Sequence, residues 1–171
     1  MKKNGQVWVE TVIYLLIGIS IIGLMIAIMK PKIDSLKDKT IIEQSQEVFK
    51  QIDEQIMSLS FSPAGNTRQL QINLKNGKIM IDGKNDNLTY ILDNSRYPIS
   101  EPGQPINNGL FDIITEKRGE SYIIKFSKHY LLNLTLEGAD KERTISPGAA
   151  SQELIVATNG TIGNKIQINI E

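Results

Sequence analysis

Residues 11–29 read TVIYLLIGISIIGLMIAIM and contain no charged side chain. At about 1.5 Å of rise per residue, a helix of this length spans the hydrocarbon core of a bilayer. A helix in the core of a soluble domain is apolar on one face only, whereas this run is apolar all round. The run therefore predicts a helix that is surrounded by lipid or by other helices.

The composition of the whole chain excludes several classes of function. The 171 residues include 19 Lys and Arg against 19 Asp and Glu, no Cys and one His. Zero net charge argues against a nucleic-acid binder with a broad basic surface. Without Cys there are no disulfides, thiol nucleophiles or thiolate metal sites, and a single His excludes a multi-histidine metal centre. Because the β region also shows no catalytic constellation, we expect no enzyme activity, no cofactor and no metal, and an enzyme on a membrane anchor is the remaining alternative.

A cleaved secretory signal is the first alternative for the apolar run. Such signals have a shorter apolar region that is followed by a small-x-small cleavage site. Here the run ends in Ala27-Ile28-Met29-Lys30-Pro31, which lacks that site, and no Cys follows for a lipoprotein anchor. We therefore expect the apolar helix to remain attached to the rest of the chain.

The residues before the run are unusual for a membrane anchor. A short basic head, Met1 to Gly5, precedes Gln6, and Glu10 places a carboxylate at the edge of the apolar helix. One interpretation leaves Glu10 among the lipid headgroups, where the cost of its charge is low. The other interpretation pairs the Glu10 carboxylate with a positively charged group. A cut after Gly5 would create an α-amino group on Gln6, with a pKa near ~7.7–8.0, about one helical turn from Glu10 or beside it on a neighbouring helix.

The string KKNGQVWVETVIYLLIGISIIGL resembles the class III signal peptide of archaeal type IV pilin-like proteins. The matching residues are Lys2, Lys3, Gly5, Gln6 and Glu10. Many members carry Ser where this chain has Trp8, and Trp is common at membrane interfaces. The resemblance implies that a prepilin peptidase cuts between Gly5 and Gln6 and removes a leader of residues 1–5.

The resemblance also implies a fold and a function. The fold is α+β and type IV pilin-like: a long N-terminal helix with a hydrophobic half (residues 6–29) and an amphipathic half (residues 30–60), packed on an extracytoplasmic antiparallel β domain (residues 61–171). The function is that of a structural, adhesive subunit of an archaeal surface filament. Glu10 would pair with the Gln6 amine of a neighbour and set the register.

The implied partners are copies of the chain, which form a homopolymer through their N-terminal helices, the prepilin peptidase, and indirectly an assembly platform and its ATPase. The precursor would be anchored in the membrane, and the mature protein would lie in an extracellular filament at the cell surface. Two alternatives share these signals: a single-pass surface binding module that stays in the membrane, and a pseudopilin of a secretion-type machine.

The helix is predicted to continue past the apolar run. From Ile33 onward apolar residues recur at three- and four-residue spacing, and acidic and basic residues, Asp53 among them, occupy the remaining faces. Pro31 removes one backbone hydrogen bond and is expected to kink the helix. The segment from Ser60 to Gly65 ends it. The apolar positions are Ile33, Leu36, Thr40, Ile41, Val48, Phe49, Ile52, Ile56 and Leu59.

The remaining residues read as β structure. Eight runs with strand character cover residues 68–74, 78–81, 88–92, 110–115, 122–126, 131–136, 153–157 and 165–170. Asn76-Gly77 is predicted to close a hairpin between the first two runs, and residues 116–120 and 159–164 to form two more. Residues 97–109 hold three Pro and two Gly and are predicted to be a loop. We expect one antiparallel sandwich or rolled sheet packed on the amphipathic half of the helix.

The β region offers few candidates for chemistry. His129 is predicted to be a solvent-exposed turn residue, and an enzyme would need a pocket around it. The Asp82–Asn87 segment is either a solvated turn or a calcium loop, although it lacks the spacing of a known calcium motif. Three N-glycosylation sequons begin at Asn87, Asn133 and Asn159.

The sidedness of the chain follows from two arguments that disagree. Lys30, Lys32, Lys37 and Lys39 outnumber Lys2 and Lys3, so the positive-inside rule predicts a cytoplasmic β region. The resemblance and the sequons predict the opposite, and we expect the β region to be extracytoplasmic.

Overall fold

The computed structural model describes residues 4–148 and 150–171, with side chains from Val7 onward. It divides into two compact units, Met1–Lys37 and Asp38–Glu171, which are taken separately below. Helix α1 (Asn4–Ser60) extends from the first unit into the second. The strands are β1 (Thr67–Ile72), β2 (Lys78–Asp82), β3 (Asn87–Ser95), β4 (Ile106–Asn107), β5 (Asp112–Arg118), β6 (Ser121–His129), β7 (Asn133–Leu136), β8 (Glu142–Ile145), β9 (Gln152–Ile162) and β10 (Lys165–Ile170).

In the second unit, one face of the helix is buried against the β domain. The predicted apolar stripe is confirmed from Phe49 to Leu59, and Ile42, which the periodicity did not select, belongs to it. Asp53, expected on a polar face, lies on the buried face instead, because two polar side chains of the β domain bond to it. The buried positions are Ile42, Ser45, Phe49, Ile52, Asp53, Ile56 and Leu59.

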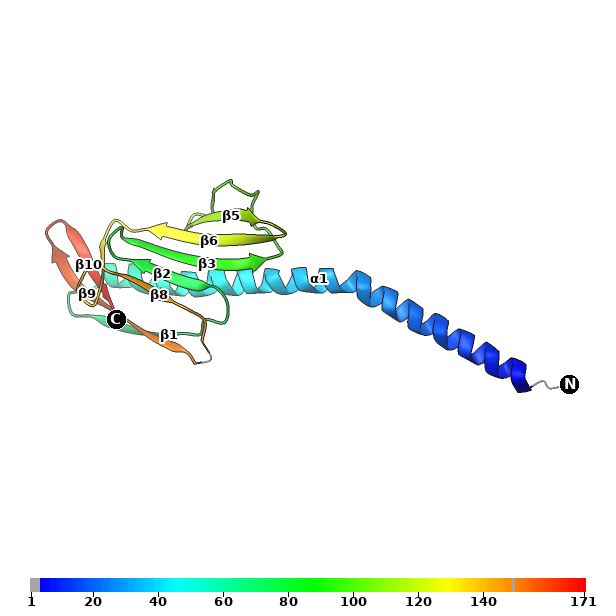
Figure 1. Cartoon of the computed structure of the whole chain (residues 1–171). Helices are drawn as coiled ribbons and strands as arrows, with labels where there is room; N and C mark the ends of the chain where they lie inside the picture. The colour runs from blue at the N-terminus through cyan, green and yellow to red at the C-terminus, as the bar shows by residue number, and fades with distance from the viewer. Residues whose placement is uncertain (1–3, 149) are drawn as a thin grey trace. The chain divides into compact units, whose positions relative to one another are not determined.

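A six-stranded sheet in the order β4-β5-β6-β3-β2-β8 lies alongside this part of α1 (Figure 1). All of its neighbouring strands are antiparallel. The sheet contacts the helix through aromatic rings: the Phe49 ring centroid lies 4.9 Å from that of Phe111 and 6.4 Å from that of Phe126, both in edge-on geometry. These rings and aliphatic residues of both sheets form one hydrophobic core.

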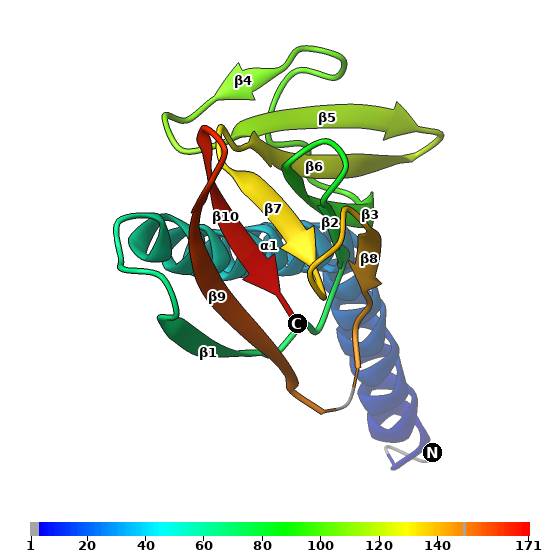
Figure 2. The ribbon, with the colours of Figure 1, turned by 90° about the vertical axis from the view of Figure 1, so that its left-hand side faces the viewer.

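The second sheet has four strands in the order β1-β9-β10-β7 (Figure 2). Strands β10 and β7 pair in parallel, which departs from the single antiparallel sheet or sandwich that we predicted. The parallel pairing is possible because the chain between these two strands is long and contains β8 and β9. The α+β class, with one long helix and largely antiparallel sheets, is confirmed.

The predicted hairpin at Asn76-Gly77 is wrong. Strand β1 pairs with β9, and β2 pairs with β3 and β8, so this turn carries the chain from one sheet to the other. Gly77 has a φ of 69°, and a Cβ at this position would lie 2.6 Å from the Tyr90 ring. The turn sequence therefore serves close packing against β3 and not the pairing of two adjacent strands.

The other two predicted hairpins are confirmed. Arg118 pairs with Ser121 around Gly119-Glu120, and Ile162 pairs with Lys165 around Gly163-Asn164. Strands β4 and β8 were not predicted, since both are short edge strands whose residues are mostly exposed. Strand β4 lies inside the 97–109 segment that we predicted to be a loop.

A buried polar cluster joins the helix to the six-stranded sheet. The Lys128 ammonium lies 2.7 Å from Asp53 Oδ2, and the Tyr130 hydroxyl donates to Asp53 Oδ1 at 2.8 Å. The ammonium also lies 5.5 Å from the centroid of the Tyr130 ring. Burial, and then the negative charge of Asp53, raise the pKa of Tyr130, so its hydroxyl stays protonated and continues to donate.

We predict that Asp53→Ala lowers the free energy of unfolding by about 3 kcal/mol, because the substitution leaves a half-buried ammonium and a buried hydroxyl without their acceptor. Asp93→Ala is the matched control. It breaks the exposed 3.7 Å pair with Lys78 and should cost less than about 1 kcal/mol. Urea unfolding of the detergent-solubilised chain, followed by tyrosine near-UV circular dichroism, measures both. Equal losses in the two variants would contradict a structural role for the cluster.

Candidate functional site

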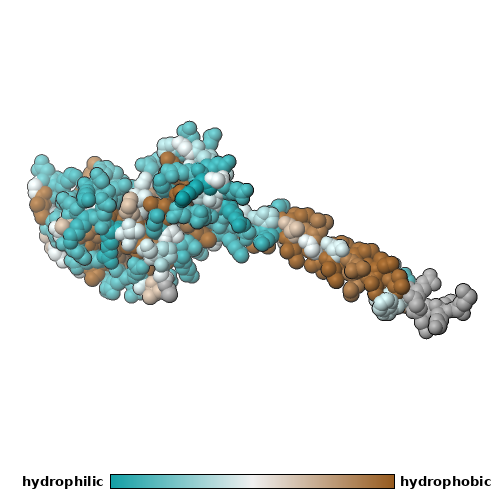
Figure 3. All heavy atoms as spheres, in the orientation of Figure 1, coloured by the Kyte–Doolittle hydropathy of each residue, from teal (hydrophilic) through white to brown (hydrophobic). Residues whose placement is uncertain are grey.

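The first unit consists of helix α1 residues with an apolar surface on all sides. The large side chains from Val7 to Met29 are exposed, and hydrophobic residues cover the visible surface of this segment (Figure 3). By length and composition, α1 is the one helix among the described residues that is apolar enough to cross a membrane. No part of its most apolar window is buried within the chain. The apolar helix predicted from residues 11–29 is thus present, and it has no cover of its own.

The polar side chains in this run bond within the helix. Thr11 Oγ1 donates to the Val7 carbonyl at 2.9 Å, and Ser20 Oγ donates to the Leu16 carbonyl at 2.7 Å. Each hydroxyl thereby satisfies its donor without leaving the helix surface. These groups add no requirement for water, so the segment is suited to lipid or to other helices.

Glu10 is the one acidic side chain among the described residues of the run and its lead-in. Its carboxylate is exposed, and the Tyr14 hydroxyl one turn later approaches Glu10 Oε1 at 3.5 Å. A single long hydrogen bond satisfies little of a carboxylate's capacity of about four acceptor sites. The carboxylate therefore keeps room for a cationic partner from outside the chain.

The predicted cleavage site lies at the beginning of the helix. The backbones of Gly5 and Gln6 belong to α1, while the side chain of Gln6 lies outside the described side chains. Lys2 and Lys3 of the predicted leader also lie outside the described residues. Pro31 lies inside α1, which continues on both sides of it, and the kink expected there stays a prediction.

Two glycines of the apolar run are not required by the packing of the chain itself. A Cβ added at Gly18 or Gly23 would meet nothing within 4 Å. Glycine inside a helix costs up to about 1 kcal/mol relative to alanine, so these positions weaken the isolated helix. Small residues allow close approach of neighbouring helices in a membrane or a bundle.

The residues of the β domain that we considered for catalysis or for metal binding lie in or beside turns. His129 is exposed at the end of β6, with Nδ1 3.0 Å from the Asn85 carbonyl. Asp82 accepts hydrogen bonds from the backbone of Lys84 and from both the side chain and backbone of Asn85, and the Asn85 side chain contributes most to lowering the pKa of Asp82. Asp86 accepts from Leu134 N–H and Lys165. The carboxylates thus organise the turn, as a solvated turn requires.

The three sequons differ in accessibility. Asn159 is exposed on β9, and its side-chain amide donates to Gln167 Oε1 at 3.2 Å. Asn87 and Asn133 are half-buried within strands β3 and β7, and the threonines of their sequons, Thr89 and Thr135, are buried. Exposure therefore favours Asn159 as a glycan acceptor over the other two.

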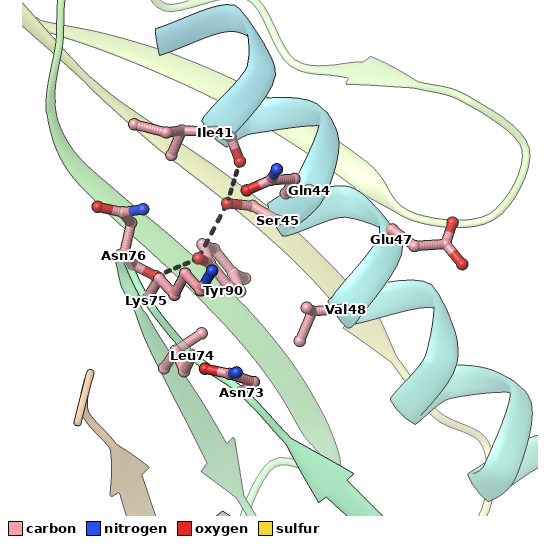
Figure 4. Close-up of a pocket in the computed structure, with 10 residues that line it drawn as sticks. All are labelled: Ile41, Gln44, Ser45, Glu47, Val48, Asn73, Leu74, Lys75, Asn76 and Tyr90. Carbon is pink, nitrogen blue, oxygen red and sulfur yellow. Dashed lines mark hydrogen bonds between the residues drawn. The ribbon is translucent and has the colours of Figure 1, made fainter. Parts of the chain in front are cut away.

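Two grooves in the second unit were not predicted. One, of about 350 Å³, lies between α1 and the segment before β2 (Figure 4). Its floor holds a hydrogen-bond chain in which Ser45 Oγ contacts the Ile41 carbonyl at 2.7 Å and the Tyr90 hydroxyl at 2.9 Å, and Tyr90 donates to the Asn76 carbonyl. Burial raises the pKa of Tyr90, which keeps that donor protonated.

The second groove, of about 420 Å³, lies at the end of α1 beside the β6–β7 junction. His129 borders it, as the enzyme alternative would require, but apolar side chains make up most of the lining. Neither groove has a local sequence signal, because the residues that line each one come from segments far apart in the chain.

The comparisons with known proteins add no family to this description. No protein family model matches the chain, and no curated protein or solved structure matches it.

Proposed function

We propose that this chain is the structural subunit of an archaeal type IV pilus-like surface filament and is matured by a prepilin peptidase that cuts between Gly5 and Gln6. The observation that carries the proposal is the apolar helix of the first unit, which is exposed on all sides and has a carboxylate near its beginning. A helix of this kind needs an apolar cover that the chain does not supply. The resemblance of residues 2–10 to class III signal peptides supports neighbouring helices of the same kind as that cover.

The proposal accounts for a helix that is apolar on all sides and contains two glycines, Gly18 and Gly23. In the membrane, lipid covers the side chains from Val7 to Met29. In an extracellular filament no lipid is present, so the helices must cover one another, and each fully buried Leu, Ile or Met stabilises the bundle by about 1.5–3 kcal/mol relative to exposure to water. Gly18 and Gly23 would let adjacent backbones approach closely.

Glu10 would supply the register in such a bundle. A carboxylate without a partner is costly in an apolar bundle, whereas a carboxylate paired with the Gln6 amine of a neighbour is compensated. Because this pairing is possible at one axial offset only, it would select one stagger of neighbouring helices. The apolar side chains alone would allow many different staggers of neighbouring helices. The adhesive and glycan-bearing surfaces would then belong to the β domain.

A membrane-anchored surface binding module is the second candidate. The same helix is long and apolar enough to hold a single protein in a bilayer, and the groove beside the β6–β7 junction would serve as a binding surface. The two candidates differ in the fate of residues 1–5. A pseudopilin of a secretion-type machine would share the cleavage but form a short assembly.

We predict that the mature protein begins at Gln6. Intact-mass spectrometry of the chain, purified from archaeal cells that contain a prepilin peptidase, should show the loss of residues 1–5. Gly5→Val should retain the full length, because a branched side chain replaces the small residue at the expected cut. Asn66→Val, at an exposed loop position that is distant from the leader in the sequence, is the control and should be cleaved normally. A Met1 start in the unmodified chain would support the anchored module instead.

We predict that Glu10→Ala leaves the cleavage intact and abolishes filaments, because the register pair is lost while the apolar surface is unchanged. Electron microscopy of the cell surface measures the outcome. Glu43→Ala is the matched control: it removes an exposed carboxylate that pairs with Lys39 at 3.9 Å further along the same helix, and it should assemble normally. Normal filaments from Glu10→Ala would remove the register role.

We predict that Gly18→Leu leaves the monomer unchanged and lowers filament yield. A Cβ added at Gly18 meets nothing within 4 Å, and leucine is a good helix former, so helix content in detergent should not fall below that of the unmodified protein. The leucine side chain would separate neighbouring helices in the bundle. Ile19→Leu keeps the volume at the next position and serves as the control, with sheared filament protein per cell as the measurement. Equal yields would show that close approach at Gly18 is not part of assembly.

A further inference from the structure

The groove at the end of α1 is apolar and is bordered by exposed hydrophobic side chains. Helix residue Met57, Leu132 at the β6–β7 junction and Ile166 of β10 contribute to its lining. Phe61 and Leu131 on its border are 84% and 88% exposed. Side chains of this size are costly to leave in water, so a complementary apolar partner would be favoured here.

Two lysine side chains and a histidine side chain also line this groove. Lys128, Lys165 and His129 line the groove, and no acidic residue is among the described residues that do. Each of these side chains has a polar partner. Lys128 forms an ion pair with Asp53 at 2.7 Å, and Lys165 forms one with Asp86 at 2.9 Å. His129 Nδ1 lies 3.0 Å from the Asn85 carbonyl oxygen. The two ammonium groups have three donors each, and the side chain of Lys165 remains 52% exposed. Asp53 and Asp86 offset the charges of the two ammonium groups, but Lys165 is exposed and keeps donors beyond its bond to Asp86, so the groove can bind an apolar partner that also carries a carboxylate.

The loop from Tyr97 to Leu110 of the same chain has the complementary character. Its side chains Ile106 and Leu110 are 41% and 47% exposed. Glu101 is exposed in the same loop, and the sequence from Tyr97 to Glu116 contains Glu101, Asp112 and Glu116 but no Lys or Arg. None of the loop residues is among those that line the groove of their own chain.

This loop is held in one conformation although it is exposed. Asn108 Oδ1 accepts from the backbone N–H groups of Leu110 and Phe111, both at 3.0 Å. Asn107 accepts from Gly109 N–H at 2.7 Å and donates to Asp112 at 2.6 Å. Gly103 N–H donates to the Thr115 carbonyl at 2.8 Å. Docking a loop that is already ordered loses little conformational entropy, so a small contact is sufficient.

We propose that the loop 97–110 of one copy docks into the α1-end groove of a second copy, with Ile106 and Leu110 against the apolar lining and Glu101 beside Lys165. This inference rests on the proposed filament and names the contact between β domains within it. Because the two surfaces are different, the contact is heterologous. Repetition of a heterologous contact propagates an open assembly unless the rotation closes a ring.

The experiment uses the fact that the chain contains no cysteine. Two differently tagged full-length chains, one with Leu110→Cys and the other with Leu131→Cys, are produced together in cells and treated with a short bismaleimide. Both positions are exposed, so the substitutions leave the core intact. We expect a cross-linked dimer that carries both tags, at roughly ten times the yield of the control, since assembly raises the local concentration of the two thiols.

The control pairs Leu110→Cys with Gln71→Cys, an exposed position on β1. Adding Glu101→Lys to the Leu110→Cys chain should lower the yield by roughly threefold, because a favourable charge pair becomes repulsive. The unsubstituted chain, which contains no cysteine, measures the background reaction of the bismaleimide.

Four outcomes separate this inference from the proposed filament. Filaments with the doubly tagged dimer support both. Filaments with a dimer yield equal to the control overturn the docking contact alone. The dimer without filaments supports the contact and overturns the filament function, and the absence of both overturns both. In any of these cases, cross-linking of the Leu131→Cys chain to a different protein and not to the Leu110→Cys chain also overturns the contact.

Discussion

The constraint on which this protein depends is the exclusion of water from the uncharged helix of residues 11–29. The side chains are exposed within the chain, and their hydroxyls bond to the helix's own backbone. Nothing in the described part of the first unit covers them. Any stable state of the protein must therefore supply lipid or other helices. The first unit therefore needs an apolar cover from outside the chain, whereas the second unit has a hydrophobic core of its own, to which both α1 and the sheets contribute.

In the second unit the same helix is amphipathic, and its apolar face is covered by the chain itself. From Ile42 to Leu59 its apolar residues face one side only, and this side packs on the sheets. Asp53 lies in the middle of the buried face and would be strongly destabilising alone. Lys128 and Tyr130, from two positions of one β segment, compensate it and make the docking of helix on sheet specific. Apolar contacts such as Phe49 on Phe126 tolerate small shifts, whereas the two bonds to Asp53 do not.

The sequence predicted the features that have a local physical cause. The helix end at Ser60 follows from Pro63 and Gly65, and the turns at Gly119 and Gly163 have the glycine that a two-residue hairpin requires. The Asn76-Gly77 turn misled the prediction because its local chemistry resembles a hairpin, while the partner of each strand is chosen by long-range packing around Tyr90. For the same reason the sequence did not predict the Asp53 cluster, because Asp53 is more than 70 positions from both Lys128 and Tyr130. Both grooves have this origin too, since each is assembled from several distant segments.

The two surfaces that we propose for assembly depend on different forces. Contacts between apolar helices use packing and the exclusion of water, which salt does not weaken. The loop 97–110 and the α1-end groove add opposite charges at an exposed border, which salt screens over about 8–10 Å. A polymer that uses both has a core that is insensitive to ionic strength and an outer layer that is sensitive to it. Rising salt should therefore loosen the contacts between β domains before it affects the helices. Because the chain contains no cysteine, no disulfide could hold the outer layer of the proposed filament, and the strength of that layer would depend on the fit between its surfaces.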